Sequence, residues 1–168
     1  MSQKDTSEKR RLITWQDHTP SVQAAQTMNG LDYLQSIAKG HLPAPPIGAL
    51  LNMTLAEVTH GRVIFTIEPA DYHYNPIGTV HGGVAATLLD SSTACAIHST
   101  LAAGVGYTTV ELKVNYIRPL TDKTGLVRCI GEVIHVGRRL ATAEAKLIDA
   151  NDKLYAHGTS TCMIFQPE

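Results

Sequence analysis

A polar loop that ends in two glycines and opens an apolar helix is the part of this chain best suited to chemistry. The loop runs from Asn75 to His81, Gly82 and Gly83 follow it, and the helix pattern continues through Asp90. A helix start has unpaired N–H groups and a partial positive charge, and glycine lets an oxyanion or a polarised carbonyl approach them closely. Because a lone carboxylate in an apolar helix is costly unless it has a task or a partner, the pattern indicates acyl chemistry.

Composition limits the other classes of function. The 168 residues are enough for one domain with a substantial core, and a net charge of −1 without a basic block disfavours nucleic-acid binding. Three widely separated cysteines form no C-x-x-C pair, which indicates neither a disulfide framework nor a zinc ribbon and is typical of a reducing compartment. The charged N-terminus differs from a signal peptide, and no apolar run reaches the roughly 20 residues that span a bilayer. We therefore expect a soluble, cytoplasmic protein that binds neither nucleic acid nor membrane.

Three segments are expected along the chain. Residues 1–20 are dominated by charge, Thr and Pro and are predicted to form a flexible arm. Residues 21–48 should contain one helix, with Ser21 as its N-cap and Gly40 just past its end, followed by a proline-rich connector. Residues 49–168 make up the main domain.

The main domain combines short strand patterns with a single helix pattern. The helix, roughly Gly82 to Leu101, has small and apolar residues on nearly every side and should be buried all round. In the strand after it, Val110, Leu112, Val114 and Tyr116 alternate with polar residues, which predicts that these four share a half-buried face. Strands are expected at residues 50–58, 63–68, 109–116, 126–136, 140–149 and 154–165. Short turns between them favour an antiparallel sheet that curves around the helix, an α+β fold.

Over residues 50–165 the sequence resembles the hot-dog-fold acyl-CoA thioesterases, and in particular their phenylacetyl-CoA thioesterase-like branch. The resemblance is carried by Asn75, His81-Gly82-Gly83, Asp90, the strand from Thr109 to Tyr116, Arg118-Pro119, Gly137-Arg138-Arg139 and Ala143-Glu144-Ala145. It implies the hot-dog fold, a curved antiparallel sheet wrapped around a long central helix. The helix before residue 40 is an addition that this core does not require.

The resemblance also implies a reaction, the hydrolysis of acyl-CoA to free acid and coenzyme A without a metal or another cofactor. Gly82 would donate its backbone N–H to the thioester carbonyl, and Asp90 would be the general base on water or the nucleophile. Asn75 would help to place the substrate or the water. Thr109 would supply a hydroxyl from the next strand, unless its neighbour Thr108 takes that position.

Gly82 and Asp90 cannot readily serve the same carbonyl within one chain. Eight helical residues rise about 12 Å, whereas a general base must lie within about 3 Å of its proton donor. If both groups act on one thioester, they come from two subunits whose helices meet with antiparallel sense. We therefore expect a homodimer with active sites at its interface, and the branch that the chain resembles commonly forms tetramers from such dimers.

Each candidate residue also has a structural interpretation. Asp90 could cap a loop or bond to Thr87 or Thr93. Gly82 and Gly83 could simply allow close packing of helix and strand. His81, at the N-cap position, is expected to hold the loop by bonding to backbone rather than to act as a base. Asn75 could form an Asx turn.

Basic residues near the expected site could neutralise the phosphates of coenzyme A. The candidates are Arg118, Arg138 and Arg139, together with Lys113, and the alternative is that they are ordinary exposed charges. Gly83 and Thr108 are further candidates for contact with the substrate.

Other chemistries have less support in the sequence. The eight histidines show no H-E-x-x-H or paired-ligand spacing, and no G-x-S-x-G motif is present. An enoyl-CoA hydratase of the same fold would need a paired Asp and His, which Asp71 and His73 mimic weakly. A non-catalytic acyl-CoA-binding regulatory module would not need Asp90. The acyl group itself stays open between aryl and short or medium aliphatic.

Overall fold

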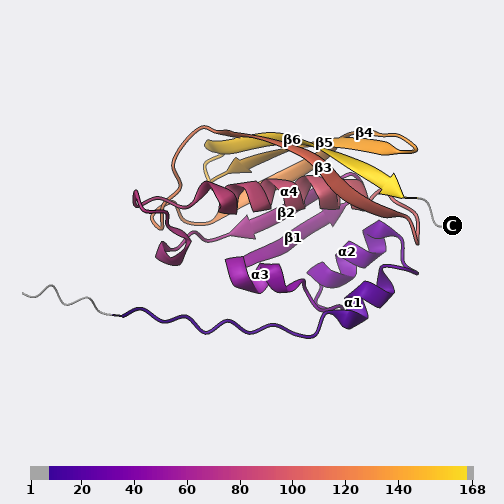
Figure 1. Cartoon of the computed structure of the whole chain (residues 1–168), viewed down its shortest axis with the longest axis horizontal. Helices are drawn as coiled ribbons and strands as arrows, with labels where there is room; N and C mark the ends of the chain where they lie inside the picture. The colour runs from indigo at the N-terminus through magenta and orange to yellow at the C-terminus, as the bar shows by residue number, and fades with distance from the viewer. Residues whose placement is uncertain (1–7, 166–168) are drawn as a thin grey trace, which may run out of the picture.

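The computed structural model describes residues 8–165, in which six strands form one antiparallel sheet. Their order across the sheet is β1 (Met53–Thr59), β2 (Arg62–Ile67), β4 (Val127–Val136), β5 (Leu140–Ile148), β6 (Leu154–Phe165) and β3 (Gly106–Tyr116). The sheet curls around the long helix α4 (Gly82–His98), with β1 and β2 on one side of it and the remaining strands on the other (Figure 1). The predicted α+β hot-dog architecture is confirmed.

The sequence of α4 lets the sheet close tightly around it. Leu88, Leu89 and Ile97 are fully buried against the strands, and most of the other helix residues are buried or half-buried. Gly131 on β4 faces the carbonyl of Ser92, and a Cβ at this glycine would lie 2.2 Å from that oxygen. The absence of a side chain at this point therefore allows the backbone of the helix to touch the sheet.

A bulge in β3 changes which of its residues face the helix. The pairing of β3 with β6 shifts between Thr109 and Glu111, so Val110 is the extra residue. The predicted half-buried face is therefore wrong at Val110, which is 51% exposed. Tyr116, at the end of the strand, is also more exposed than predicted, at 58%. One inserted residue reverses the alternation beyond it, and Thr109 turns toward α4 instead.

The predicted single helix over residues 21–40 is wrong: the structure has α1 (Thr19–Ala24) and α2 (Gly30–Ala38). The first helix ends at Ala24, and Asn29 caps the second by accepting a hydrogen bond from the N–H of Asp32. Gly30 packs so closely on α4 that a Cβ there would lie 1.7 Å from the carbonyl oxygen of His98. The break in the helix therefore allows Gly30 to pack closely on α4. The helical spacing of apolar residues cannot predict this tertiary contact.

The proline-rich connector also contains structure. It includes α3 (Pro46–Leu51), with proline in the first helical position, where its missing N–H costs nothing. The first strand consequently begins at Met53 rather than at Leu50. The loop between β2 and α4 carries one short 3₁₀ turn, η1 (Asp71–His73).

Residues 8–18 run in an extended conformation past α3 (Figure 1). The guanidinium of Arg11 lies 4.0 Å from the ring centre of Tyr72 and donates hydrogen bonds to the carbonyls of Ala49 and Leu50. This part of the predicted flexible arm is thus tied to α3 and η1, while its first seven residues lie outside the described residues. Between residues 8 and 165, no helix is long and apolar enough to cross a membrane.

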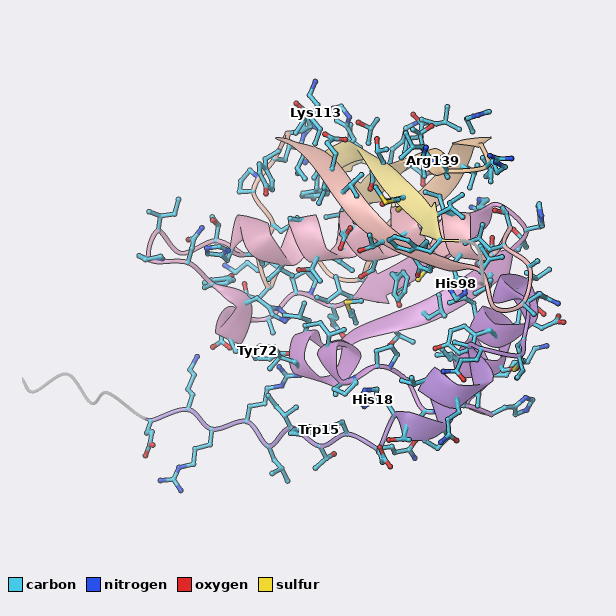
Figure 2. The ribbon with its side chains drawn as sticks, turned by 45° about the vertical axis from the view of Figure 1, so that its right-hand side comes forward. Trp15, His18, Tyr72, His98, Lys113 and Arg139 are labelled. Atoms are coloured by element: carbon cyan, nitrogen blue, oxygen red, sulfur yellow. The ribbon has the colours of Figure 1, made fainter. Side chains whose placement is uncertain are left out.

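His98, at the end of α4 (Figure 2), is a buried imidazole that contacts two tyrosine rings. Its ring centre lies 5.3 Å from that of Tyr33 and 4.8 Å from that of Tyr107. Burial lowers the pKa of His98 to about 4, because the charged form would lose its hydration. The side chain therefore contributes packing as a neutral ring.

This burial predicts that the fold weakens in mild acid. Since the pKa of His98 is lower in the folded state than in the unfolded state, the unfolded chain binds more protons below about pH 6.5. We expect the free energy of unfolding to fall by about 2 kcal/mol between pH 7.5 and pH 5 from this residue. Urea unfolding of the wild type and of His98→Phe at both pH values measures it. An equal loss in the variant, which cannot titrate here, would contradict the assignment.

Candidate active site

The start of α4 presents a free backbone donor. His81 is the N-cap, and its Nδ1 accepts a hydrogen bond of 2.9 Å from the N–H of Gly83, the predicted bond to backbone. Gly82 donates its N–H to no other described residue. It borders a hollow of about 290 Å³ together with Tyr116 and Arg118. At the positive end of a helix, this N–H is suited to an oxygen that gains negative charge.

The loop before α4 is braced by its own side chains. The Oδ1 of Asn75 accepts hydrogen bonds from the N–H groups of Ile77 and Thr79, at 3.1 and 3.2 Å, and its Nδ2 donates to the hydroxyl of Thr79. The Asx turn is therefore present. The N–H of His81 donates to the carbonyl of His73 at 2.8 Å. Together these bonds fix the direction in which the chain enters the helix.

Asp90 meets a hydroxyl from β3. The Oγ1 of Thr109 donates a hydrogen bond of 2.8 Å to Oδ1 of the half-buried Asp90, while Oδ2 accepts none from the described residues. Thr108 is exposed on the other face of the strand, so the bulge brings Thr109 and not its neighbour to the carboxylate. Thr93, on the same helix as Asp90, donates to backbone carbonyls instead. A carboxylate held at one oxygen and open at the other can accept a proton from water or attack a carbonyl carbon.

The two groups lie apart within the chain. Gly82 is the first residue of α4 and Asp90 the ninth, which corresponds to about 12 Å along the helix axis. The hollow at Gly82 does not include Asp90. Each chain therefore holds two separate parts of a candidate site. One is a backbone donor at the start of α4, and the other is a carboxylate near the middle of α4.

Comparison with known proteins assigns the family. The model of the thioesterase superfamily matches residues 77–156, which include Gly82, Asp90 and Thr109. Human acyl-coenzyme A thioesterase 13 is 32% identical over 110 residues, which cover 65% of this chain and 77% of that protein. The chain belongs to the thioesterase superfamily.

Solved structures agree with this assignment. A phenylacetic acid degradation-related protein of Ralstonia eutropha superposes with a TM-score of 0.70 at 28% identity, over 78% of this chain and 98% of its own. A conserved protein of Pseudomonas aeruginosa gives a TM-score of 0.68 at 30% identity, over 73% and 95%. The protein is thus a thioester hydrolase of the hot-dog fold.

The basic residues of this thioesterase are not brought together within the chain. Arg118 lies shortly after the end of β3, borders the hollow at Gly82 and donates to the carbonyl of Leu154 at 2.6 Å. Arg138 and Arg139 line a second hollow with Phe165, which pairs with Gly106 at the other end of β3. The 11 residues of β3 separate these two places by about 33 Å. Figure 2 shows Arg139 and Lys113 on the side of the sheet away from α4.

Tyr116 is a site residue that the sequence did not single out. Its hydroxyl donates to the carbonyl of Gly82 at 3.2 Å, and a Cβ at Gly82 would lie 3.2 Å from its ring. The tyrosine therefore covers the helix start and leaves little room for a side chain at position 82. The alternation along β3 predicted that Tyr116 would be half-buried. Its place at the end of β3, close to Arg118, was the only sequence feature that indicated another role.

Asp71 and His73 do not form the pair that a hydratase would need. Asp71 forms an ion pair with Lys9. In the buried ring of His73, Nδ1 accepts a hydrogen bond from the N–H of Ala70, and Nε2 lies 3.0 Å from the carbonyl oxygen of Leu51. Because both ring nitrogens bond to backbone, this histidine links α3 to the loop and has no free nitrogen for acid or base work.

Proposed function

We propose that this thioesterase hydrolyses acyl-CoA to the free acid and coenzyme A at two equivalent sites of a homodimer. The observation that carries the proposal is the separation of a free N–H at Gly82 from a half-open carboxylate at Asp90 on a single helix. Neither group suffices alone, and one chain cannot bring them to the same carbonyl. The similarity to acyl-coenzyme A thioesterase 13 supports coenzyme A as the leaving group.

The open edge of β3 supports the dimer. β3 pairs on one side with β6, and its other edge is open in the described chain. Tyr116, at the end of β3, touches Gly82, whereas Thr109, near its beginning, touches Asp90. Antiparallel pairing of two such edges about a two-fold axis would set the end of one β3 beside the beginning of the other. Gly82 would then lie near the partner subunit's Asp90.

In this arrangement the two subunits divide the chemistry. The N–H of Gly82 polarises the thioester carbonyl and stabilises the oxyanion that forms. The partner subunit's Asp90 uses its free oxygen to deprotonate water, or attacks the carbonyl carbon itself, while Thr109 holds the other oxygen. The C–S bond then breaks, and coenzyme A leaves as a thiolate, which needs no strong general acid. If Asp90 is the nucleophile, the acyl group is left on it as a mixed anhydride, which water hydrolyses to the free acid and the carboxylate. The proposed reaction uses no metal or redox cofactor.

The same pairing would collect the basic residues. Arg118 lies at the end of β3, and Arg138 and Arg139 lie at its beginning, so antiparallel pairing would set Arg118 near the partner subunit's Arg138 and Arg139. Guanidinium groups from both subunits could thus bind the phosphates of coenzyme A. The proposal includes a cytoplasmic location and the association of two dimers into a tetramer, as in the branch that the sequence resembles.

The test is the release of free thiol from a panel of aliphatic and aryl acyl-CoA esters by the purified protein, with its mass in solution measured in parallel. We expect turnover of at least one ester and a mass of two or four chains. A folded protein that releases thiol from no ester would overturn hydrolysis, and addition of water to an enoyl-CoA would then be assayed. A monomer that turns over esters at full rate would overturn the shared site.

A further inference from the structure

A small apolar cavity lies between α4 and the helices that precede the sheet. It has a volume of about 110 Å³, and its lining side chains are apolar apart from Ser91. Leu34 and Ile37 of α2 and Ile47 of α3 enclose it on one side, and Ser91 and Cys95 form its wall on α4. Residues of β1 and β2 close the remaining side.

The cavity begins next to the candidate carboxylate. Ser91 directly follows Asp90, so their Cα atoms are about 3.8 Å apart, and Cys95 lies about one turn further. On α4, the residues Asp90, Ser91 and Cys95 are all half-buried, so the helix is not fully covered between the carboxylate and the cavity. An acyl group whose carbonyl is attacked near Asp90 can continue along this strip into the cavity.

We propose that the cavity holds the far end of the acyl group, and that the enzyme prefers straight aliphatic acyl thioesters of about six carbons to aryl ones. The inference rests on the proposed hydrolysis and adds the substrate class to it. Benzene, with six carbons, occupies an apolar cavity of about 150 Å³, or about 25 Å³ per carbon. A volume of about 110 Å³ is therefore too small for an aromatic ring and holds about four methylene-sized groups. The carbonyl carbon beside Asp90 and one linking carbon complete the six.

The outer wall of the cavity comes from the two helices that precede β1. α2 and α3 lie outside residues 77–156, which the superfamily model matches. They are held in place by the close contact of Gly30 with His98 and by the buried hydroxyl of Ser21, which donates to the carbonyl of Pro43 at 2.6 Å. Figure 1 shows both helices beside β1 and below α4. The N-terminal helices would thus set the length of the acyl chain.

Burial of each methylene group of the acyl chain increases affinity about fourfold. As the acyl chain lengthens, kcat/KM should therefore rise about fourfold per carbon up to about six carbons and then fall. Two changes at Ile47 on α3, which is 42% exposed and therefore tolerant, test the wall. Ile47→Phe should lower kcat/KM for hexanoyl-CoA about tenfold and leave butyryl-CoA within about twofold. Ile47→Ala should move the optimum to about eight carbons. Leu50→Phe and Leu50→Ala, on the exposed side of the same helix, are the matched controls and should leave the profile unchanged.

The outcomes separate this inference from the proposed function. A maximum at about six carbons that shifts with Ile47 but not with Leu50 supports the pocket. Preference for phenylacetyl- or benzoyl-CoA, or a profile that both Ile47 variants leave in place while their melting temperatures show a folded protein, would overturn it. If no ester is hydrolysed, calorimetric titration with butyryl- and hexanoyl-CoA tests the pocket separately. If hexanoyl-CoA binds more tightly than butyryl-CoA and Ile47→Phe removes this difference, the pocket stands and only hydrolysis is rejected. If the two esters bind equally, both proposals are rejected.

Discussion

The variant Asp90→Asn is expected to hydrolyse its best acyl-CoA ester about 10²- to 10⁴-fold more slowly than the wild type, because an amide is neither a general base nor a nucleophile. Its structure should be unchanged. The amide oxygen of an asparagine can still accept the hydrogen bond that Thr109 donates to Oδ1, and Oδ2 of Asp90 has no described partner to lose. Rates measured by thiol release, with melting temperatures alongside, test the prediction.

Two companion measurements sharpen this result. Thr109→Val removes the hydroxyl but leaves the carboxylate, and we expect a rate loss of about tenfold, because one charge-assisted hydrogen bond is lost. A single turnover in heavy-oxygen water distinguishes the two roles of Asp90, since label in the protein identifies the nucleophile and label confined to the acid product favours the general base. Asp90→Asn with undiminished turnover would remove Asp90 from the mechanism.

The arrangement of the strands and of α4 followed from the sequence because each of these elements has a strong local signal. The glycines at the start of α4, the turn residues between the last strands and the long apolar run to His98 all act within a few residues. Strand ends at β4, β5 and β6 were therefore predicted to within one residue. These patterns reflect backbone conformation and burial, which short-range sequence reports well.

The rest depends on contacts between distant segments. The break before Gly30 is needed for packing on His98, and the bulge at Val110 arises from pairing with β6. Without the bulge, the choice between Thr108 and Thr109 cannot be derived from alternation. Alternation does not predict the exposure of Tyr116 either, because Tyr116 shares its face with the half-buried Leu112 and Val114. The function of Asn75 also depends on which groups its side-chain amide is hydrogen-bonded to. Within the described chain, all of these hydrogen bonds are to residues of its own loop. Sequence reasoning could therefore propose candidate residues for the site, but it could not give their geometry.

The second large effect is expected from the backbone N–H of Gly82, which a single substitution can remove. Gly82 is the first residue of α4, a position that tolerates proline because its N–H has no helical partner. The preceding residue, His81, has φ −59° and ψ 134°, within the extended range that proline requires of its neighbour. Gly82→Pro should therefore keep the helix and lose the donor. The loss of one oxyanion donor costs about 2.7–4 kcal/mol, or about 10²- to 10³-fold in kcat.

Gly82→Ala is the matched control for this change. Both variants add a Cβ, which would lie 3.2 Å from the ring of Tyr116, but only the proline lacks the N–H. Crowding against Tyr116 should therefore lower the rate in both variants, and the ratio between them reports the donor. Equal rates for Gly82→Ala and Gly82→Pro would show that the N–H takes no part in the reaction.

Mixing the two defective chains tests whether the sites are shared. In a hybrid dimer of Gly82→Pro and Asp90→Asn subunits, both substitutions fall in one site, and the other site combines an intact Gly82 with an intact Asp90 from its partner. Equal mixing after reversible dissociation makes about half of the dimers hybrid, so we expect about one quarter of the wild-type activity from two nearly inactive proteins. If each chain instead carried a complete site, the mixture would stay as inactive as its components, because every chain would contain one defect.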